Sequence, residues 1–307
     1  MSTRVAVREV GMRDGLQIIG TFMQTEHKIE WLRRCDEAGF AEVEIGSFVP
    51  ERYIPQFRDI EQVAASSRSL PGLTTAAFVP NLRGAQRALD CGIDRLLCVL
   101  SATESFSKAN LRRTKQQSFS ELEAIVALRD ERASRGQRAT IEVGVSASFG
   151  CPFEGRIPDA ELYALAHSAV EAGVDGVALA DTAGQGDPAQ VKRVFRTLVL
   201  ELPETSLSAH FHDTRGQGLA NVVAALDAGV LAFDSAVAGL GGCPNSPGAT
   251  GNIATEDLVF MLEAMGLDTG IDIGRLLAIR EFVAQCLPNV PLYGHVGKVG
   301  LPKGFPA

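Results

Sequence analysis

The chain lacks the long apolar segments that mark membrane and secreted proteins. No stretch of its 307 residues approaches the roughly 18 consecutive apolar residues that a spanning helix needs. The first ten residues, Met1 to Val10, contain no apolar signal core. We therefore expect no membrane partner and a cytoplasmic protein.

Paired cysteines are also missing. The six cysteines stand alone and never form a CxxC pair; they are Cys35, Cys91, Cys98, Cys151, Cys243 and Cys286. A core-rich chain of this length has no need of disulfides, so we expect reduced thiols. The sequence also contains neither GxGxxG nor GxxxxGK[ST], the phosphate-binding signatures of open nucleotide-binding sheets.

The chain has fewer positively charged residues than negatively charged ones, 29 against 37. The formal net charge is −8, and a surface that contacts many phosphates must instead be basic. We therefore exclude nucleic acid as a partner. A small anionic substrate remains compatible with the sequence if an Arg, a Lys or a metal ion neutralises it locally.

What the chain does contain is apolar sequence, at 46% of residues, in a regular alternation of strand and helix patterns. Eight segments have strand character: Val5–Val10, Glu42–Phe48, Leu73–Val79, Arg95–Ser101, Thr140–Ser148, Gly176–Asp181, Leu207–His212 and Ala232–Val237. Eight strands that alternate with helices predict an α/β fold, a (β/α)8 TIM barrel in a single domain, 1–307. The alternative is an open doubly wound sheet, whose nucleotide signatures are absent.

The helices carry clear start and spacing signals. Asp187 and Pro188 precede apolar residues at helical spacing, as expected of a capped helix. Ile271–Leu287 predicts an additional C-terminal helix outside the eight units. The remaining tail, Pro288 to Ala307, is rich in Gly and Pro, and we expect it to be irregular.

Polar residues cluster where the predicted strands end, which is where active sites lie in such barrels. Two histidines, His210 and His212, alternate at the end of one strand and should share a face. Together with a carboxylate, best supplied by Asp14, they predict a divalent metal site. The alternative is a pair of structural histidines. Further strand-end residues are Arg13, Glu44, Ser101, Ser146, Asp181 and Asn252.

Three of the other polar positions each allow two interpretations. Cys243 lies in a glycine-rich loop, where an exposed thiol could act as acid or nucleophile, or could be incidental. Arg13 could stabilise a developing anion or pair with a neighbouring acid. Asp181 could orient a ligand histidine and help to move a proton, or could cap a helix.

Several of these segments together resemble the 3-hydroxy-3-methylglutaryl-CoA lyase family. They are Arg13–Gln17 (RDGLQ), Glu44 with Ser47-Phe48, Gly150–Gly155 (GCPFEG), His210–Thr214 (HFHDT), Ala238–Pro244 (AGLGGCP), Gly248–Asn252 (GATGN) and Ala254–Leu258 (ATEDL). The likeness runs in register from about Val5 to about Leu287, and the Cys243 loop is its most specific part.

The resemblance implies a Mg2+- or Mn2+-dependent TIM-barrel lyase that splits the methylglutaryl thioester into acetyl-CoA and acetoacetate, as in leucine degradation and ketone-body formation. It also implies an acyl-CoA partner and a homodimer. The implied metal residues are Asp14, His210, His212 and Asn252. The implied catalytic residues are Arg13, Cys243, Asp181 and Glu44, and Glu256 matches a position near the metal loop. Arg13, Gln17, Ser101 and Ser146 are expected to bind substrate.

The chain departs from the family pattern at walls of the expected pocket. Ile18-Ile19, Ile45-Gly46 and Asn245-Ser246-Pro247 replace residues that the family favours there. We therefore expect the same bond cleavage, with an acyl substituent that the sequence does not identify. Two other classes stay open: a metal-dependent aldolase of 4-hydroxy-2-oxo acids, and a catalytically silent acyl-CoA-binding protein.

Overall fold

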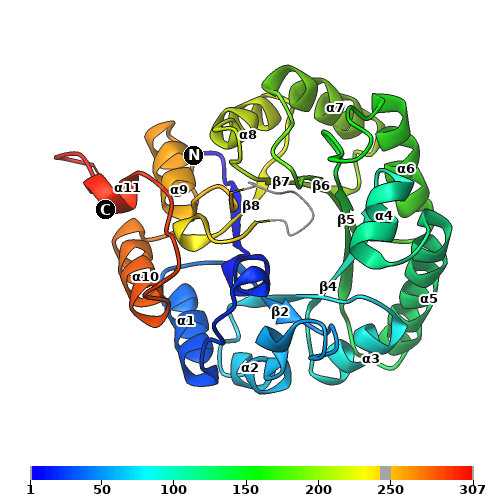
Figure 1. Cartoon of the computed structure of the whole chain (residues 1–307), viewed down its shortest axis with the longest axis horizontal. Coiled ribbons are helices and arrows are strands. Elements are labelled where there is room, and N and C mark those ends of the chain that lie inside the picture. Colours follow the sequence, from blue (N-terminus) through cyan, green and yellow to red (C-terminus); the bar gives the residue numbers. More distant parts are fainter. Residues whose placement is uncertain (1, 243–249, 306–307) are drawn as a thin grey trace.

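The computed structural model describes residues 2–242 and 250–305, and its strands close into one parallel barrel (Figure 1). Each strand pairs with the next in the chain, and β1 pairs with β8 to close the ring, with Ala6 opposite Ala232. The strands are β1 (Ala6–Glu9), β2 (Glu42–Ser47), β3 (Thr74–Phe78), β4 (Arg95–Ser101), β5 (Thr140–Ser146), β6 (Gly176–Asp181), β7 (Ser206–Phe211) and β8 (Ala232–Ser235). The predicted TIM barrel and all eight predicted strands are confirmed.

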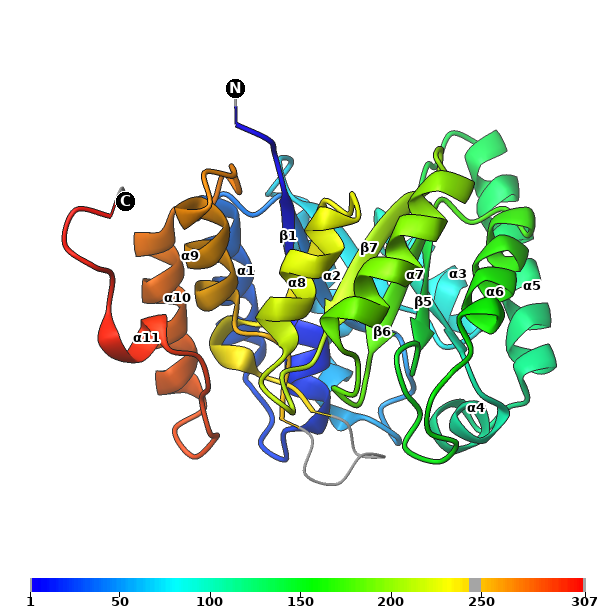
Figure 2. The ribbon, with the colours of Figure 1, turned by 90° about the horizontal axis from the view of Figure 1, so that it is seen from above.

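Helices surround this barrel (Figure 1). They are α1 (Thr25–Glu37), α2 (Ile60–Ser67), α3 (Leu82–Asp90), α4 (Glu104–Leu111), α5 (Lys115–Ser134), α6 (Asp159–Glu171), α7 (Pro188–Glu201), α8 (Gly218–Asp227), α9 (Thr255–Ala264), α10 (Ile273–Cys286) and α11 (Val296–Val299). Figure 2 shows the N-terminus at one end of the barrel and α4 at the other, where the strands end. None of the helices that the structure describes is long and apolar enough to cross a membrane.

Local sequence explains why the helices begin and end where they do. The Asp187 carboxylate accepts the backbone N–H of Gln190, and Pro188 occupies the first turn of α7. The apolar stripe of α7 is fully buried against the barrel, including Val194 and Phe195. After α8, Gly229 takes φ +101°, a left-handed conformation that turns the chain into β8.

The predicted additional helix corresponds to α10, which packs against α1 (Figure 1). The expectation of an irregular tail is wrong at one place, because α11 forms within it. The carboxylate of Asp257 on α9 accepts the backbone N–H groups of His295 and Val296, the latter at 2.7 Å. This long-range cap satisfies the first turn of α11, and local sequence does not reveal it.

Candidate metal centre and active-site cavity

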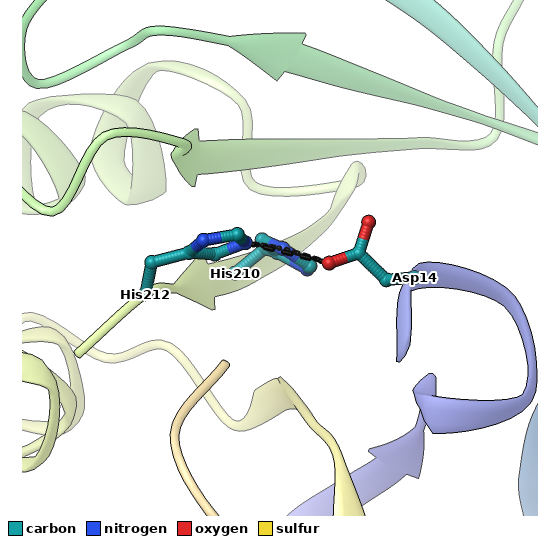
Figure 3. A group of neighbouring side chains, drawn as sticks. All are labelled: Asp14, His210 and His212. Carbon is teal, nitrogen blue, oxygen red and sulfur yellow. Dashed lines mark hydrogen bonds and ion pairs between the residues drawn. The ribbon is translucent and has the colours of Figure 1, made fainter. Parts of the chain in front are cut away.

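Three side chains predicted as metal ligands converge at the carboxyl edge of the barrel (Figure 3). The Nε2 atoms of His210 and His212 lie 3.1 Å apart. The Oδ2 atom of Asp14 lies 3.4 Å from the His212 Nε2 and 4.0 Å from the His210 Nε2. All three residues are buried. The two histidines therefore present one nitrogen each to the same point, beside a carboxylate oxygen.

Strand geometry places the two histidines together, as the sequence predicts. His210 belongs to β7 and His212 follows its last residue, so a period of two sends both rings to the inside of the barrel. Phe211 points the other way and packs on Phe149, with ring centroids 6.0 Å apart. Its fully buried ring anchors the strand end that carries the histidines.

Asp14 comes from the π-helical turn Gly11–Gly15 that follows β1. Its Oδ1 accepts hydrogen bonds from the Arg13 guanidinium at 2.5 Å and the Gln17 amide at 2.7 Å. Burial alone would raise the pKa of Asp14, but Arg13 and the two imidazoles outweigh burial and hold that pKa well below its usual range. Asp14 is therefore ionised, as a metal ligand must be.

Asn252 lies beside this group. Its amide Nδ2 donates to the Asp14 Oδ2 at 2.8 Å and to the Leu240 carbonyl at 2.9 Å. Its Oδ1 is buried and has no hydrogen-bond partner among the residues that the structure describes. An unpaired buried amide oxygen is costly, and a cation would satisfy it.

The donor set fits a divalent cation. It combines two imidazole nitrogens, an ionised carboxylate and an amide oxygen, a mixed nitrogen and oxygen set of the kind that holds divalent metal ions. Two ligands at right angles around an ion with bonds of ~2.1 Å lie about 3 Å apart. The observed 3.1 Å between the histidine nitrogens matches that spacing. Two neutral imidazoles that face each other through Nε2 need either a proton or a cation between them.

A carboxylate that the sequence analysis did not identify, Asp234 on β8, fixes one of these rings. Its Oδ2 lies 3.1 Å from the His210 Nδ1. Burial lowers the pKa of His210, but this hydrogen bond and the charge of Asp14 outweigh it and give a net raised pKa. A proton on Nδ1 leaves the Nε2 lone pair free to bind metal. The signal in the sequence was a charged residue inside a strand that is buried on both faces.

Asp234 is itself held by a buried ion network. Arg8 on β1 donates to the Asp234 Oδ1 at 2.6 Å, to the Glu142 carboxylate at 2.7 Å and to the Ser208 hydroxyl at 2.9 Å. Burial would raise the pKa of Asp234, yet Arg8 and His210 lower it to about 2. Arg8 and Glu142 also interrupt apolar strands, so the same sequence signal could have identified them.

Arg13 is bound between two acids. Its Nε donates to the Glu44 Oε1 at 2.5 Å, and its NH1 donates to Asp14. Burial raises the pKa of Glu44 to about 7, and the Arg13 charge opposes that rise. The two acids hold the guanidinium in place at the edge of the metal centre.

A cavity of about 780 Å³ opens onto this centre. Among the predicted site residues, its lining contains Arg13, Asp14, Gln17, Glu44, Ser146, His210 and His212. The Ser146 hydroxyl lies 2.9 Å from that of Ser101, which is almost fully buried. The structure thus places both serines at the ends of neighbouring strands, with Ser146 facing the cavity.

The remaining predicted residues have different surroundings. The Asp181 carboxylate accepts the backbone N–H groups of Gln185 at 2.8 Å and Gly186 at 3.0 Å, and burial raises its pKa. The hydrogen bond to a ligand-type histidine comes from Asp234 instead. Glu256 is buried and accepts the Ala238 N–H at 3.0 Å. Cys243 lies outside the described residues, so its predicted role stays a prediction.

Comparison with known proteins points to one family. A family model described as HMGL-like matches residues 4–283. A hydroxymethylglutaryl-CoA lyase of Bacillus subtilis (strain 168) is 37% identical over 92% of this chain and 93% of its own length. The human mitochondrial hydroxymethylglutaryl-CoA lyase is 37% identical over 92% of this chain and 86% of its own length.

Solved structures agree with the sequence comparison. The HMG-CoA lyase of Acinetobacter baumannii, solved with coenzyme A and 3-methylmalate, is 38% identical and superposes with a TM-score of 0.90 over 99% of this chain and 97% of that one. The HMG-CoA lyase of Bacillus subtilis has a TM-score of 0.91 at 36% identity, over 97% of this chain and 98% of that one. On these grounds, the chain belongs to the HMGL-like family, among relatives that are HMG-CoA lyases.

Proposed function

We propose that the chain is a divalent-metal-dependent carbon–carbon lyase acting on 3-hydroxy-3-methylglutaryl-CoA or a related 3-hydroxyacyl-CoA. The products are acetyl-CoA and acetoacetate, or a related keto acid. One observation carries the proposal: Asp14, His210 and His212 converge beside Arg13 in the wall of one cavity. Membership of the HMGL-like family supports the same reaction.

The proposed metal residues are Asp14, His210, His212 and Asn252, and the proposed ion is Mg2+ or Mn2+. Asn252 would contribute the oxygen that has no partner among the described residues. Such an ion, when bound, lowers the pKa of a coordinated hydroxyl group and orients it. In the neutral His210 ring, the Asp234 carboxylate holds the proton on Nδ1, which leaves the Nε2 lone pair for the ion.

The remaining residues are proposed to assist the cleavage of the carbon–carbon bond. The tertiary hydroxyl loses its proton, the C2–C3 bond breaks, C3 becomes a ketone carbon and the electron pair moves into a thioester enolate. Arg13 is positioned by Glu44 and Asp14 to stabilise the enolate charge. Asp181 helps to move the hydroxyl proton, and the Cys243 thiol delivers a proton to C2.

The substrate is expected to be held in the cavity by Gln17 and Ser146, with Ser101 behind. Its thioester is a coenzyme A derivative, by analogy with the relative solved with coenzyme A. Arg112 and Arg113 line the same cavity and carry positive charge that suits a polyanionic cofactor. We also propose a homodimer and a cytoplasmic location.

The direct test is an assay of the purified protein with the methylglutaryl thioester and Mg2+ or Mn2+, in which acetyl-CoA and acetoacetate should form in equal amounts. Cys243→Ser should keep metal binding and lose most of the turnover, whereas His210→Ala should weaken metal binding itself. Absence of any thioester cleavage by a metal-loaded protein would overturn the proposal. Cleavage of a 4-hydroxy-2-oxo acid instead would replace it with the aldolase.

A further inference from the structure

The inside of the barrel is less filled than its outside along β4. Leu96 and Leu100 face away from the cavity and are at most 2% exposed. Leu97 and Val99 alternate with them, line the cavity and are only partly buried. Barrels of this type normally fill their interior with layers of bulky side chains. Here the inward positions of β4 border empty space.

Small residues on the neighbouring strands extend this space. Gly144 on β5 and Ala178 and Ala180 on β6 all line the cavity. A Cβ atom added to Gly144 would meet nothing closer than the Cys98 carbonyl at 3.8 Å and the Val99 Cγ2 at 3.9 Å. We call the region bounded by Leu97, Val99, Gly144, Ala178 and Ala180 the hollow.

The hollow extends away from the metal centre towards the middle of the barrel. Glu142 also lines the cavity and precedes Ser146 by four residues on β5, which corresponds to about 13 Å along the strand. The cavity therefore continues well below the strand ends that carry the predicted catalytic groups. A substrate anchored at the metal centre can place a side group in this space.

Charge decides what kind of group the hollow accepts. The buried network at its base contains two cations, Arg8 and Arg95, and three acids, which are Glu42, Glu142 and Asp234. Its acids outnumber its cations, so a substrate carboxylate placed there would face net repulsion and a desolvation cost. The hollow's own walls are hydrocarbon. An uncharged apolar group is favoured on both counts.

We infer that the hollow binds an apolar substituent on C3 of the substrate that is longer than methyl. This inference rests on the proposed function and specifies its substrate class: 3-hydroxyacyl-CoA thioesters with a tertiary C3 that bears such a chain. The C2–C3 bond breaks, the hydroxyl proton leaves and C2 gains one proton. The products are acetyl-CoA and a ketone that keeps the chain, with no net oxidation or reduction.

The test compares two substrates, 3-hydroxy-3-methylglutaryl-CoA and 3-hydroxy-3-butylglutaryl-CoA, which differ only in the C3 chain. In the unmodified protein kcat/KM should be about 10-fold or more higher for the butyl thioester, because each methylene adds apolar contact. Gly144→Leu and Ala178→Leu fill the hollow and should reverse this ratio. The control, Ala133→Leu, places the same side chain on the exposed surface of α5 and should leave the ratio unchanged.

Gly144→Ala serves if the larger variants fail to fold, because its methyl group fits at van der Waals contact and should lower the ratio about threefold. Preference for the methyl thioester in the unmodified protein, or a ratio that the filling variants do not change, would overturn the inference and leave the lyase proposal intact. Failure to cleave either thioester with metal bound would instead overturn the lyase proposal, and the inference with it.

Discussion

The Asp234 carboxylate orients the His210 ring through its Nδ1 atom. Through this contact, one residue can influence the metal centre. Asp234 accepts from both His210 and Arg8, so it links the buried ion network to the ligand nitrogen. The charge of Asp234 stabilises the ring with Nδ1 protonated and Nε2 available. Arg8 and Glu142 can thereby influence the metal centre through Asp234.

Asp234→Asn should lower Mn2+ affinity by about 10- to 100-fold, because the amide can no longer fix the His210 tautomer by charge. Isothermal titration calorimetry measures the affinity. Glu142→Gln is the matched control: it also removes an acid from Arg8 but makes no contact with His210. Equal loss in both variants would assign the effect to the ion network as a whole.

The raised pKa of Glu44 predicts how turnover depends on pH. Its pKa is raised to about 7, so it is protonated below that pH and releases its charge-assisted grip on Arg13. We expect kcat/KM to rise as pH increases through about 7, since ionised Glu44 holds the guanidinium in place. In Glu44→Gln this ascending limb should disappear and kcat/KM should be lower throughout. A limb that persists unchanged in the variant would belong to another group.

The sequence predicted that Asp14, His210 and His212 come together, but it did not predict the residues that support them, for a physical reason. Asp14, His210 and His212 lie at or just after strand ends, and barrel topology alone brings strand ends together. Asp234, Arg8 and Glu142 lie inside strands, and their mutual contacts depend on the register of strands that are far apart in sequence. A charged residue in a strand that is buried on both faces indicates that an ion-pair partner exists, but the sequence does not identify which residue it is.

At the scale of whole elements, the segment after β8 depends on close backbone approach. A Cβ on Gly251 would lie 1.9 Å from the Gly239 carbonyl oxygen, so only glycine fits there. The next residue, Asn252, forms an isolated bridge with His212. Strand and helix periodicity predicted the regular elements well, whereas this approach and the Asp257 cap of α11 arise from contacts between distant segments.

Gly251→Ala should lower turnover about 100-fold, because the displaced backbone moves the Asn252 amide away from Asp14 by an ångström or so. Steady-state kinetics with the methylglutaryl thioester measures this. Gly20→Ala is the control, since a Cβ at Gly20 has no atom within 4 Å and its φ needs no glycine. Normal turnover in Gly251→Ala would mean that the segment tolerates the shift.

At the scale of the whole molecule, the metal centre joins the two ends of the barrel sequence. Asp14 follows β1, the histidines belong to the end of β7 and Asn252 follows β8, so an ion bound there would tie these segments together. Binding to the folded state alone stabilises it by about 2.7 kcal/mol when free metal is 100 times Kd. Alternation of strands and helices was enough to predict the closed barrel that makes this possible.

Saturating Mn2+ should therefore raise Tm by about 5 °C, and EDTA should reverse the increase. Differential scanning calorimetry gives the shift directly. His210→Ala, which removes one proposed ligand, should show little or no shift. If neither Mn2+ nor EDTA changes the Tm of the unmodified protein, the result would favour a catalytically silent acyl-CoA-binding protein over the enzyme.

The pairing of β1 with β8 has a consequence for how the chain is made. One edge of β1 finds its partner only when Ala232–Ser235 has been synthesised. At 5–20 residues per second, the ribosome needs roughly 10 to 50 seconds to reach that point. An unpaired strand edge is a template for other chains during that interval. The hydrogen bonds between β1 and β8 close the finished barrel, but they can form only late in synthesis. One edge of β1 is therefore exposed to aggregation for most of translation.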